Sequence, residues 1–103
     1  ESNVPKSVIQ NNWFYQDPCA PDNEDRAYRV ECFRVLDGLG YRQMPAASNY
    51  LMKDSFPKLA RWSRENVPEE NLIGMLQTTW LPVLDAFRDD HFEAMDAVRE
   101  SFD

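Results

Sequence analysis

The chain has 103 residues, enough for one domain, and with 43% hydrophobic and 13% aromatic residues it has a globular composition, not a disordered one. Its formal net charge of −7 opposes binding to nucleic acid and to anionic lipid at neutral pH, and no cluster of Lys and Arg offers a local exception. No apolar run is long enough to span a bilayer. We therefore expect neither a nucleic-acid partner nor a membrane partner.

The first residue and the two cysteines do not identify the cellular compartment of the protein. The sequence opens on Glu1 without a signal peptide, which we interpret as a processed or excised chain. Its compartment stays open, with a periplasmic or extracellular location as the candidate. Cys19 and Cys32 have no metal-ligand spacing, because the only histidine is His91. We interpret Cys32 as a buried free thiol, and a Cys19–Cys32 disulfide is the alternative in an oxidising compartment.

The first predicted unit is a strand over residues 7–15 followed by a helix over residues 23–39. Prolines on both sides limit the strand, and Asn23 or Asp22 can cap the start of the helix. Gly38 and Gly40 can adopt the left-handed backbone conformation that commonly ends a helix. The residues that we expect on its apolar face recur at helical spacing: Tyr28, Cys32, Val35, Leu36 and Leu39.

The second unit is a strand over residues 41–47 and a helix over residues 54–66. Pro45 cannot donate a ladder hydrogen bond, so we expect this strand to end or bulge there. Pro57 is tolerated only in the first turn of a helix, which places the helix start near Ser55. The inward-facing residues should be Phe56, Leu59, Ala60 and Ser63.

The third unit is a strand over residues 72–79 and a long helix that opens at Pro82 and runs to about residue 102. Trp80 directly follows the strand. A stripe of residues spaced by three or four predicts the buried face of the helix: Leu84, Phe87, His91, Met95, Val98 and Phe102.

Alternation of strands and helices predicts an α/β fold, three consecutive βα units with parallel strands and right-handed crossovers. Such a sheet is incomplete, because parallel sheets are normally covered on both faces and bare edge strands seek partners. We therefore interpret residues 1–103 as a single partial domain. It should belong to a larger protein or self-associate.

Ligands of parallel α/β folds gather at the carboxyl ends of the strands. Here those ends hold aromatic, carboxylate and amide side chains, the groups that stack on a sugar ring and bind its hydroxyls. The predicted substrate-binding residues are Trp13, Tyr15, Asp17, Asn49, Tyr50 and Trp80. The alternative for Trp13 and Trp80 is that they fill the layer between sheet and helices.

Catalytic residues are not expected in the chain. Asp17 is the only carboxylate at the predicted rim, whereas glycoside hydrolysis usually needs a pair. His91 lies on the apolar stripe of a helix and is better explained as a core or boundary residue. The glycines form no phosphate-binding loop, so we expect no cofactor and no metal.

Three motifs at the strand ends, NNWFYQD, MPAASNY and IGMLQTTW, resemble the last strands of a (β/α)8-barrel glycoside hydrolase. The likeness is to the family-20-like enzymes, the β-N-acetylhexosaminidase type. It implies sugar-lining roles for Trp13, Tyr50 and Trp80. It also implies that the catalytic Asp–Glu pair lies on another strand, outside this chain.

The leading hypothesis is therefore a C-terminal fragment of a carbohydrate-processing glycoside hydrolase, the last part of the barrel. It would contribute sugar-binding residues, and alone it would be inactive. The alternative is a non-catalytic α/β interaction module that associates through open sheet edges. A stand-alone small enzyme and an all-helical fold are the remaining readings.

Overall fold

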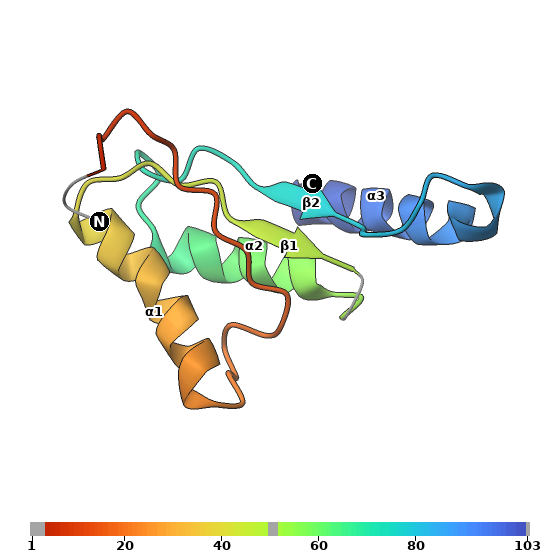
Figure 1. Ribbon diagram of the computed structural model, residues 1–103, viewed down its shortest axis with the longest axis horizontal. Coiled ribbons are helices and arrows are strands. Elements are labelled where there is room, and N and C mark those ends of the chain that lie inside the picture. The colour runs from red at the N-terminus through yellow and green to blue at the C-terminus, as the bar shows by residue number, and fades with distance from the viewer. Residues whose placement is uncertain (1–3, 50–51, 103) are drawn as a thin grey trace.

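The computed structural model describes residues 4–49 and 52–102. Its elements follow in the order α1, β1, α2, β2, α3, with a 3-10 turn at Asp85–Phe87 ahead of α3. The helices hold 15, 12 and 15 residues, whereas each strand holds 3. The protein is thus mostly helical around a two-stranded parallel sheet, as Figure 1 shows.

Helix α1 spans Glu24–Gly38, close to the predicted range. The Asn23 side chain caps it by accepting from the Arg26 backbone N–H, and Gly40 ends it with a φ of 84°. The predicted buried face is confirmed only at Leu36, because the other buried side chains are Val30 and Phe33 and not the residues that we expected. Tyr28, which we expected inside, is 70% exposed.

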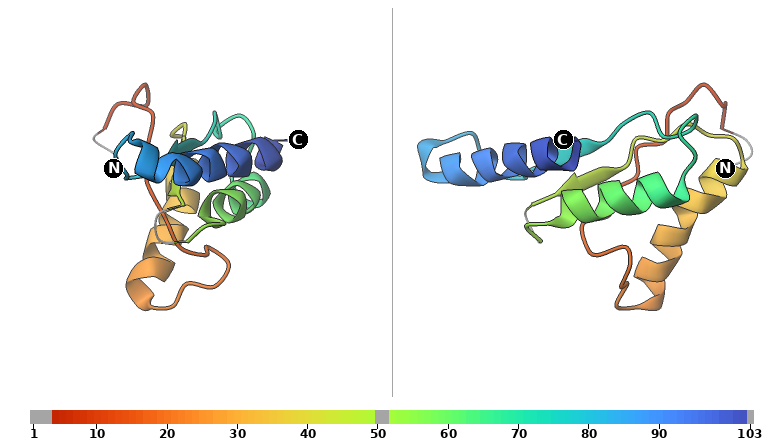
Figure 2. Two further views of the ribbon diagram at one scale, coloured as in Figure 1. Left: turned by 90° about the vertical axis from the view of Figure 1, so that its right-hand side faces the viewer. Right: turned by 180° about the vertical axis from the view of Figure 1, so that it is seen from behind.

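Helix α2 spans Ser55–Asn66 and confirms the prediction for this segment. Pro57 lies in the first turn, where its missing N–H leaves no hydrogen bond unmade. The predicted inward residues Phe56, Leu59, Ala60 and Ser63 are all buried. The helix lies along one face of the sheet (Figures 1 and 2).

Strands β1 (Ala46–Ser48) and β2 (Leu76–Thr78) pair in parallel, with Ala46 opposite Leu76 and Ser48 opposite Thr78. The prediction of three consecutive βα units is wrong, and with it the description of the fold as the last part of a (β/α)8 barrel. Residues 7–15 form no regular strand. Their backbone pairs with the middle segment at isolated parallel bridges, Gln10–Gln43 and Trp13–Ala46, and not along a continuous ladder.

A side chain interrupts the pairing of the first segment. The two bridges share one register, in which the Met44 carbonyl would accept from the Asn12 backbone N–H. The Asn11 side-chain amide instead donates to that carbonyl. Asparagine competes with ladders in this way, since its short amide reaches nearby backbone groups.

An extra residue interrupts the third segment. Gln43 bridges to Leu72, and Ala46 pairs with Leu76. Between these two pairs the chain advances three residues on the middle segment but four on the last segment, so the last segment has one extra residue. An unmatched residue of this kind acts as a bulge and breaks the ladder. Contrary to our expectation, the regular part of the middle strand does not end at Pro45 but begins after it.

Helix α3 spans Arg88–Phe102 and starts later than the predicted position at Pro82. Figure 1 shows that it returns antiparallel to β2 and protrudes past the carboxyl end of the strand. Only Ala94 of this helix is buried, and Leu84, Met95 and Phe102 of the expected inner stripe are exposed. None of the described helices has the length and apolar character that a membrane crossing needs.

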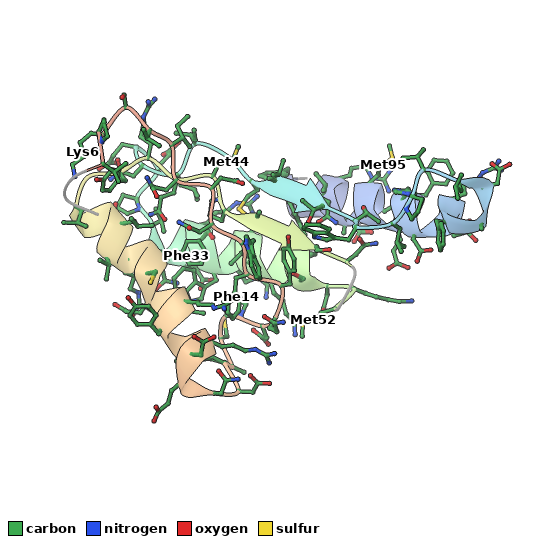
Figure 3. All side chains as sticks on the ribbon, in the orientation of Figure 1. Lys6, Phe14, Phe33, Met44, Met52 and Met95 are labelled. Atoms are coloured by element: carbon green, nitrogen blue, oxygen red, sulfur yellow. The ribbon has the colours of Figure 1, made fainter. Side chains whose placement is uncertain are left out.

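The core lies between the sheet and the helices α1 and α2. It is built from aromatic and aliphatic side chains of every segment before β2, and Leu72, Met75 and Val98 pack against it. Figure 3 shows Phe14 of the first segment and Phe33 of α1 pointing into this layer. The buried members are Phe14, Val30, Phe33, Ala47, Phe56, Leu59, Ala60, Trp62 and Val67.

Candidate functional site

Trp80 is held in an unusual backbone conformation just after β2. Its φ is 64°, the only positive φ of a non-glycine residue in the described part of the chain. A bulky side chain disfavours this left-handed region, so it persists only where the surroundings impose it. The side chain is nevertheless 67% exposed, which leaves most of the indole ring open to solvent.

A chain of hydrogen bonds fixes the polar end of that indole. Trp80 Nε1 donates to the Tyr15 hydroxyl at 2.9 Å. Thr78 Oγ1 lies 3.1 Å from the same hydroxyl and 3.1 Å from the Ala47 carbonyl oxygen. Because the carbonyl can only accept and Thr78 has one hydroxyl hydrogen, every contact is made when Thr78 donates to Ala47 and Tyr15 donates to Thr78.

Trp13 stands on the other side of Tyr15. The two ring centroids are 5.1 Å apart with an interplanar angle of 36°. The Arg29 guanidinium lies over the Trp13 ring, 5.3 Å from its centroid, and the side chain is still 55% exposed. We call Trp13, Tyr15 and Trp80 the aromatic platform: two exposed indoles joined by one buried tyrosine.

The platform follows from strand geometry. Trp13 and Tyr15 are two positions apart, so an extended backbone sends them to the same face, while Phe14 between them enters the core. Ala46 and Leu76 continue the row that Trp13 begins, and Thr78, two positions after Leu76, contacts Tyr15. Parallel pairing thus brings residues more than sixty positions apart to one rim.

Asp17 is engaged in contacts within the protein. Its Oδ1 accepts from the Cys19 backbone N–H at 2.9 Å, and its Oδ2 forms an ion pair with Lys58 Nζ at 3.1 Å. The Cys19 N–H and then the Lys58 ammonium hold the pKa of Asp17 below its ordinary value of 3.8. The same pairing raises the pKa of Lys58. Asp17 is therefore an ionised carboxylate that ties its loop to α2.

The other two predicted site residues are Asn49, which directly follows β1, and Tyr50. Asn49 Nδ2 donates to the Asp90 carbonyl oxygen at 2.9 Å, and Asn49 Oδ1 accepts from Gln77 Nε2 at 3.2 Å. Its amide thus joins the end of β1 to β2 and α3. Tyr50 lies outside the described residues.

Two residues were absent from the predicted site. Thr78 links Tyr15 to the backbone of β1, and its place at a strand end was the signal that could have included it. Arg29 comes from α1, and nothing in its local sequence indicates that it reaches Trp13. Asn12, Trp13, Arg29, Cys32 and Phe33 line a cavity of about 250 Å³ beside the platform.

The described residues offer little for metal or nucleophilic chemistry. No group of three or more His, Cys, Asp or Glu side chains among them could hold a metal ion. Cys19 and Cys32 are both free thiols, so the alternative of a disulfide between them is not realised here. His91 contacts the Pro82 carbonyl oxygen at 3.1 Å, beside α3.

Comparison of the chain with protein-family models, with curated proteins and with solved structures gives no match. The arrangement of side chains is therefore the evidence from which a function is argued. Its chief feature is a pair of exposed indole rings that both contact Tyr15, Trp80 through a hydrogen bond and Trp13 through its ring.

Proposed function

We propose that the chain binds carbohydrate on the aromatic platform and serves as the sugar-binding part of a glycoside hydrolase. The observation that carries this proposal is Trp80, held at a positive φ with its N–H bonded to Tyr15 and its ring 67% exposed. Strained backbone conformations cluster at active sites and ligand clamps, which supports a binding role for this residue. The likeness of the motifs NNWFYQD and IGMLQTTW to family-20-like enzymes supports the same function, although the barrel fold that it also implied is not found.

Sugar rings suit such a surface because their C–H faces are apolar and flat while their edges carry hydroxyls. A fixed indole buries the C–H face without losing conformational entropy on binding. In the platform the polar end of Trp80 is already occupied, so the ring face is what it offers to a ligand. Arg29 and Asn12 beside Trp13 can meet hydroxyl groups at the ring edge.

Hydrolysis would need groups that the described platform lacks. The usual mechanism uses two carboxylates on either side of the scissile bond. Asp17 is the carboxylate nearest to the platform in sequence, and both of its oxygens have partners. We therefore place the catalytic pair outside this chain, and purified chain should hydrolyse no aryl-glycoside.

Tryptophan fluorescence tests the binding proposal. Trp13 and Trp80 are exposed and should shift to the blue when a sugar covers them, whereas Trp62 is buried and should not respond. We would titrate the chain with β-linked N-acetylglucosamine oligosaccharides and with glucose oligosaccharides. The double variant Trp13→Ala, Trp80→Ala lacks both reporter rings, so its binding is measured by calorimetry beside that of the wild type, and it should lose sugar binding.

A matched control is Tyr28→Ala, which removes an exposed aromatic ring of α1 that is not part of the platform. It should bind sugar as the wild type does. Equal loss of binding in the control and in the double variant would show that the platform has no special role. No binding of any oligosaccharide at millimolar concentration would overturn the proposal.

A further inference from the structure

Strand β2 has an open edge. It pairs with β1 on one side, where the Leu76 N–H donates to the Pro45 carbonyl oxygen at 2.9 Å. Backbone groups alternate in direction along a strand, so the Gln77 N–H and carbonyl point to the opposite side. No strand among the described residues pairs with that side, since the sheet has only β1 and β2.

A largely apolar groove runs beside this edge. Its cavity of about 520 Å³ lies between Gln77 and Thr79 of the β2 segment and the side chains of Ala94, Met95 and Val98 on α3. Met95 is 64% exposed, and Figure 3 shows it projecting from the helix. A backbone laid along the edge of β2 would cover this groove.

The edge also lacks the charges that normally keep an exposed strand from pairing. Residues 72–80 contain no Lys, Arg, Asp or Glu, although the chain as a whole carries a net charge of −7. Natural edge strands are usually protected by a lysine, a proline or a covering element. Arg99, at one end of the groove, already has an ion-pair partner in Asp96 at 3.4 Å.

We propose that the β2 edge and the groove bind an extended, uncharged β strand of another polypeptide segment, with apolar side chains at alternate positions. Its backbone would pair with Gln77, and every second side chain would enter the space beside Ala94 and Met95. This is strand addition, in which main-chain hydrogen bonds give affinity and alternating pockets give specificity.

A second copy of this chain is a poorer occupant. Stable interfaces bury roughly 1,200–2,000 Å² in total, and an edge of three residues is short for a symmetric dimer of that size. Two copies would also each carry the net charge of −7 toward the other. A single neutral strand avoids the charge repulsion and needs no symmetric interface of that size. This inference is independent of the sugar platform.

The test uses a short capped peptide in which valine and threonine alternate, titrated into the whole chain by calorimetry. A peptide with lysine in place of each valine is the matched ligand control. Met95→Glu places a charge in the groove and should weaken binding of the neutral peptide by about tenfold or more. Met95→Leu keeps the apolar surface and should bind as the wild type does.

A second pair of variants tests the backbone contact. Gln77→Pro removes the outward N–H, whereas Gln77→Ala shortens the side chain but keeps that donor. Circular dichroism establishes that both are folded. We expect loss of peptide binding in the proline variant alone.

Three results would overturn the proposal. The wild type would fail to bind the neutral peptide, or Met95→Glu would bind it as tightly as the wild type does. The third is a wild-type dimer in sedimentation that Met95→Glu converts to a monomer, because the occupant would then be a second copy.

Discussion

The aromatic platform and the aromatic core lie on opposite faces of one short segment. Trp13 and Tyr15 belong to the platform, whereas Phe14 between them is 1% exposed and belongs to the core. The three tryptophans divide in the same way, with Trp62 buried at 6% exposure and Trp13 and Trp80 open. Both regions are built from aromatic residues, so the direction in which each side chain points decides which region it joins.

The regions differ in how their rings are held. In the core, Phe33 and Trp62 pack at 5.7 Å between ring centroids, and neighbouring apolar groups surround them. On the platform, hydrogen bonds through Tyr15 and Thr78 hold the Trp80 ring, and Trp13 contacts the Tyr15 ring and the Arg29 guanidinium, while both indoles stay exposed. Loss of a core ring should therefore weaken folding, and loss of a platform ring should weaken binding.

The largest expected effect tests the core half of this comparison. Trp62→Ala should lower the free energy of unfolding by about 3–5 kcal/mol, because it leaves a cavity next to Phe33. Urea denaturation followed by circular dichroism measures the change. Sugar affinity of the molecules that remain folded should be unaltered, and a selective loss of affinity would contradict the division.

Trp80→Ala tests the platform half. Loss of one stacking ring should weaken oligosaccharide binding by about 1–3 kcal/mol, or roughly ten- to a hundredfold. The free energy of unfolding should change far less than in Trp62→Ala, since the ring is mostly exposed. A sharp fall in thermal midpoint with unchanged affinity would show that Trp80 serves the fold and not the ligand.

Trp80→Gly sharpens the comparison by separating the ring from the backbone strain. Glycine adopts a φ near 64° without the steric cost that alanine bears there. We expect the glycine variant to be more stable than the alanine variant by about 1 kcal/mol, with equally weak sugar binding. Equal stability of the two would mean that the backbone at this position is not strained.

The sequence predicted the helices better than the sheet. Capping residues and proline positions are local signals, and they placed α1 and α2 within about a residue or two of their observed bounds. The strands depend on contacts between distant segments. Neither the bond from Asn11 to Met44 nor the unmatched residue between Leu72 and Leu76 can be read from local pattern.

The candidate site was predictable to the extent that it depends on alternation. Trp13, Tyr15 and Trp80 do come together, because strand ends in parallel segments meet at one edge. Asp17 and Asn49 were chosen by the same rule, but their side chains bind other parts of the protein. Arg29 shows the limit, since its contact depends on how α1 lies against the first segment.

Tyr15→Phe tests whether the hydrogen bonds hold the platform together. The change removes the hydroxyl that joins Trp80 to Thr78 and should cost about 1 kcal/mol of stability. The freed indole should also move more, which fluorescence anisotropy of Trp80 in a Trp13→Phe, Trp62→Phe background would detect. Unchanged anisotropy would show that the backbone alone positions the ring.

The smallest expected effect concerns Asp17, a predicted sugar ligand whose carboxylate instead binds Cys19 and Lys58. Asp17→Asn keeps an oxygen for the Cys19 N–H and removes the charge that faces Lys58. Because the pKa of Asp17 is lowered in the folded protein, its ionised form stabilises the fold at pH values above its ordinary pKa. That contribution is lost as the pH falls through the lowered pKa.

The stability gap between wild type and Asp17→Asn should therefore be small, constant near neutral pH, and closed in strong acid. Thermal midpoints measured across that range give the gap, and Asp22→Asn, whose carboxylate pairs with Arg26 at the surface, is the matched control. Sugar affinity should stay the same in both variants if Asp17 only anchors its loop. A selective loss of affinity in Asp17→Asn, with no stability gap at any pH, would instead place this carboxylate in the sugar site.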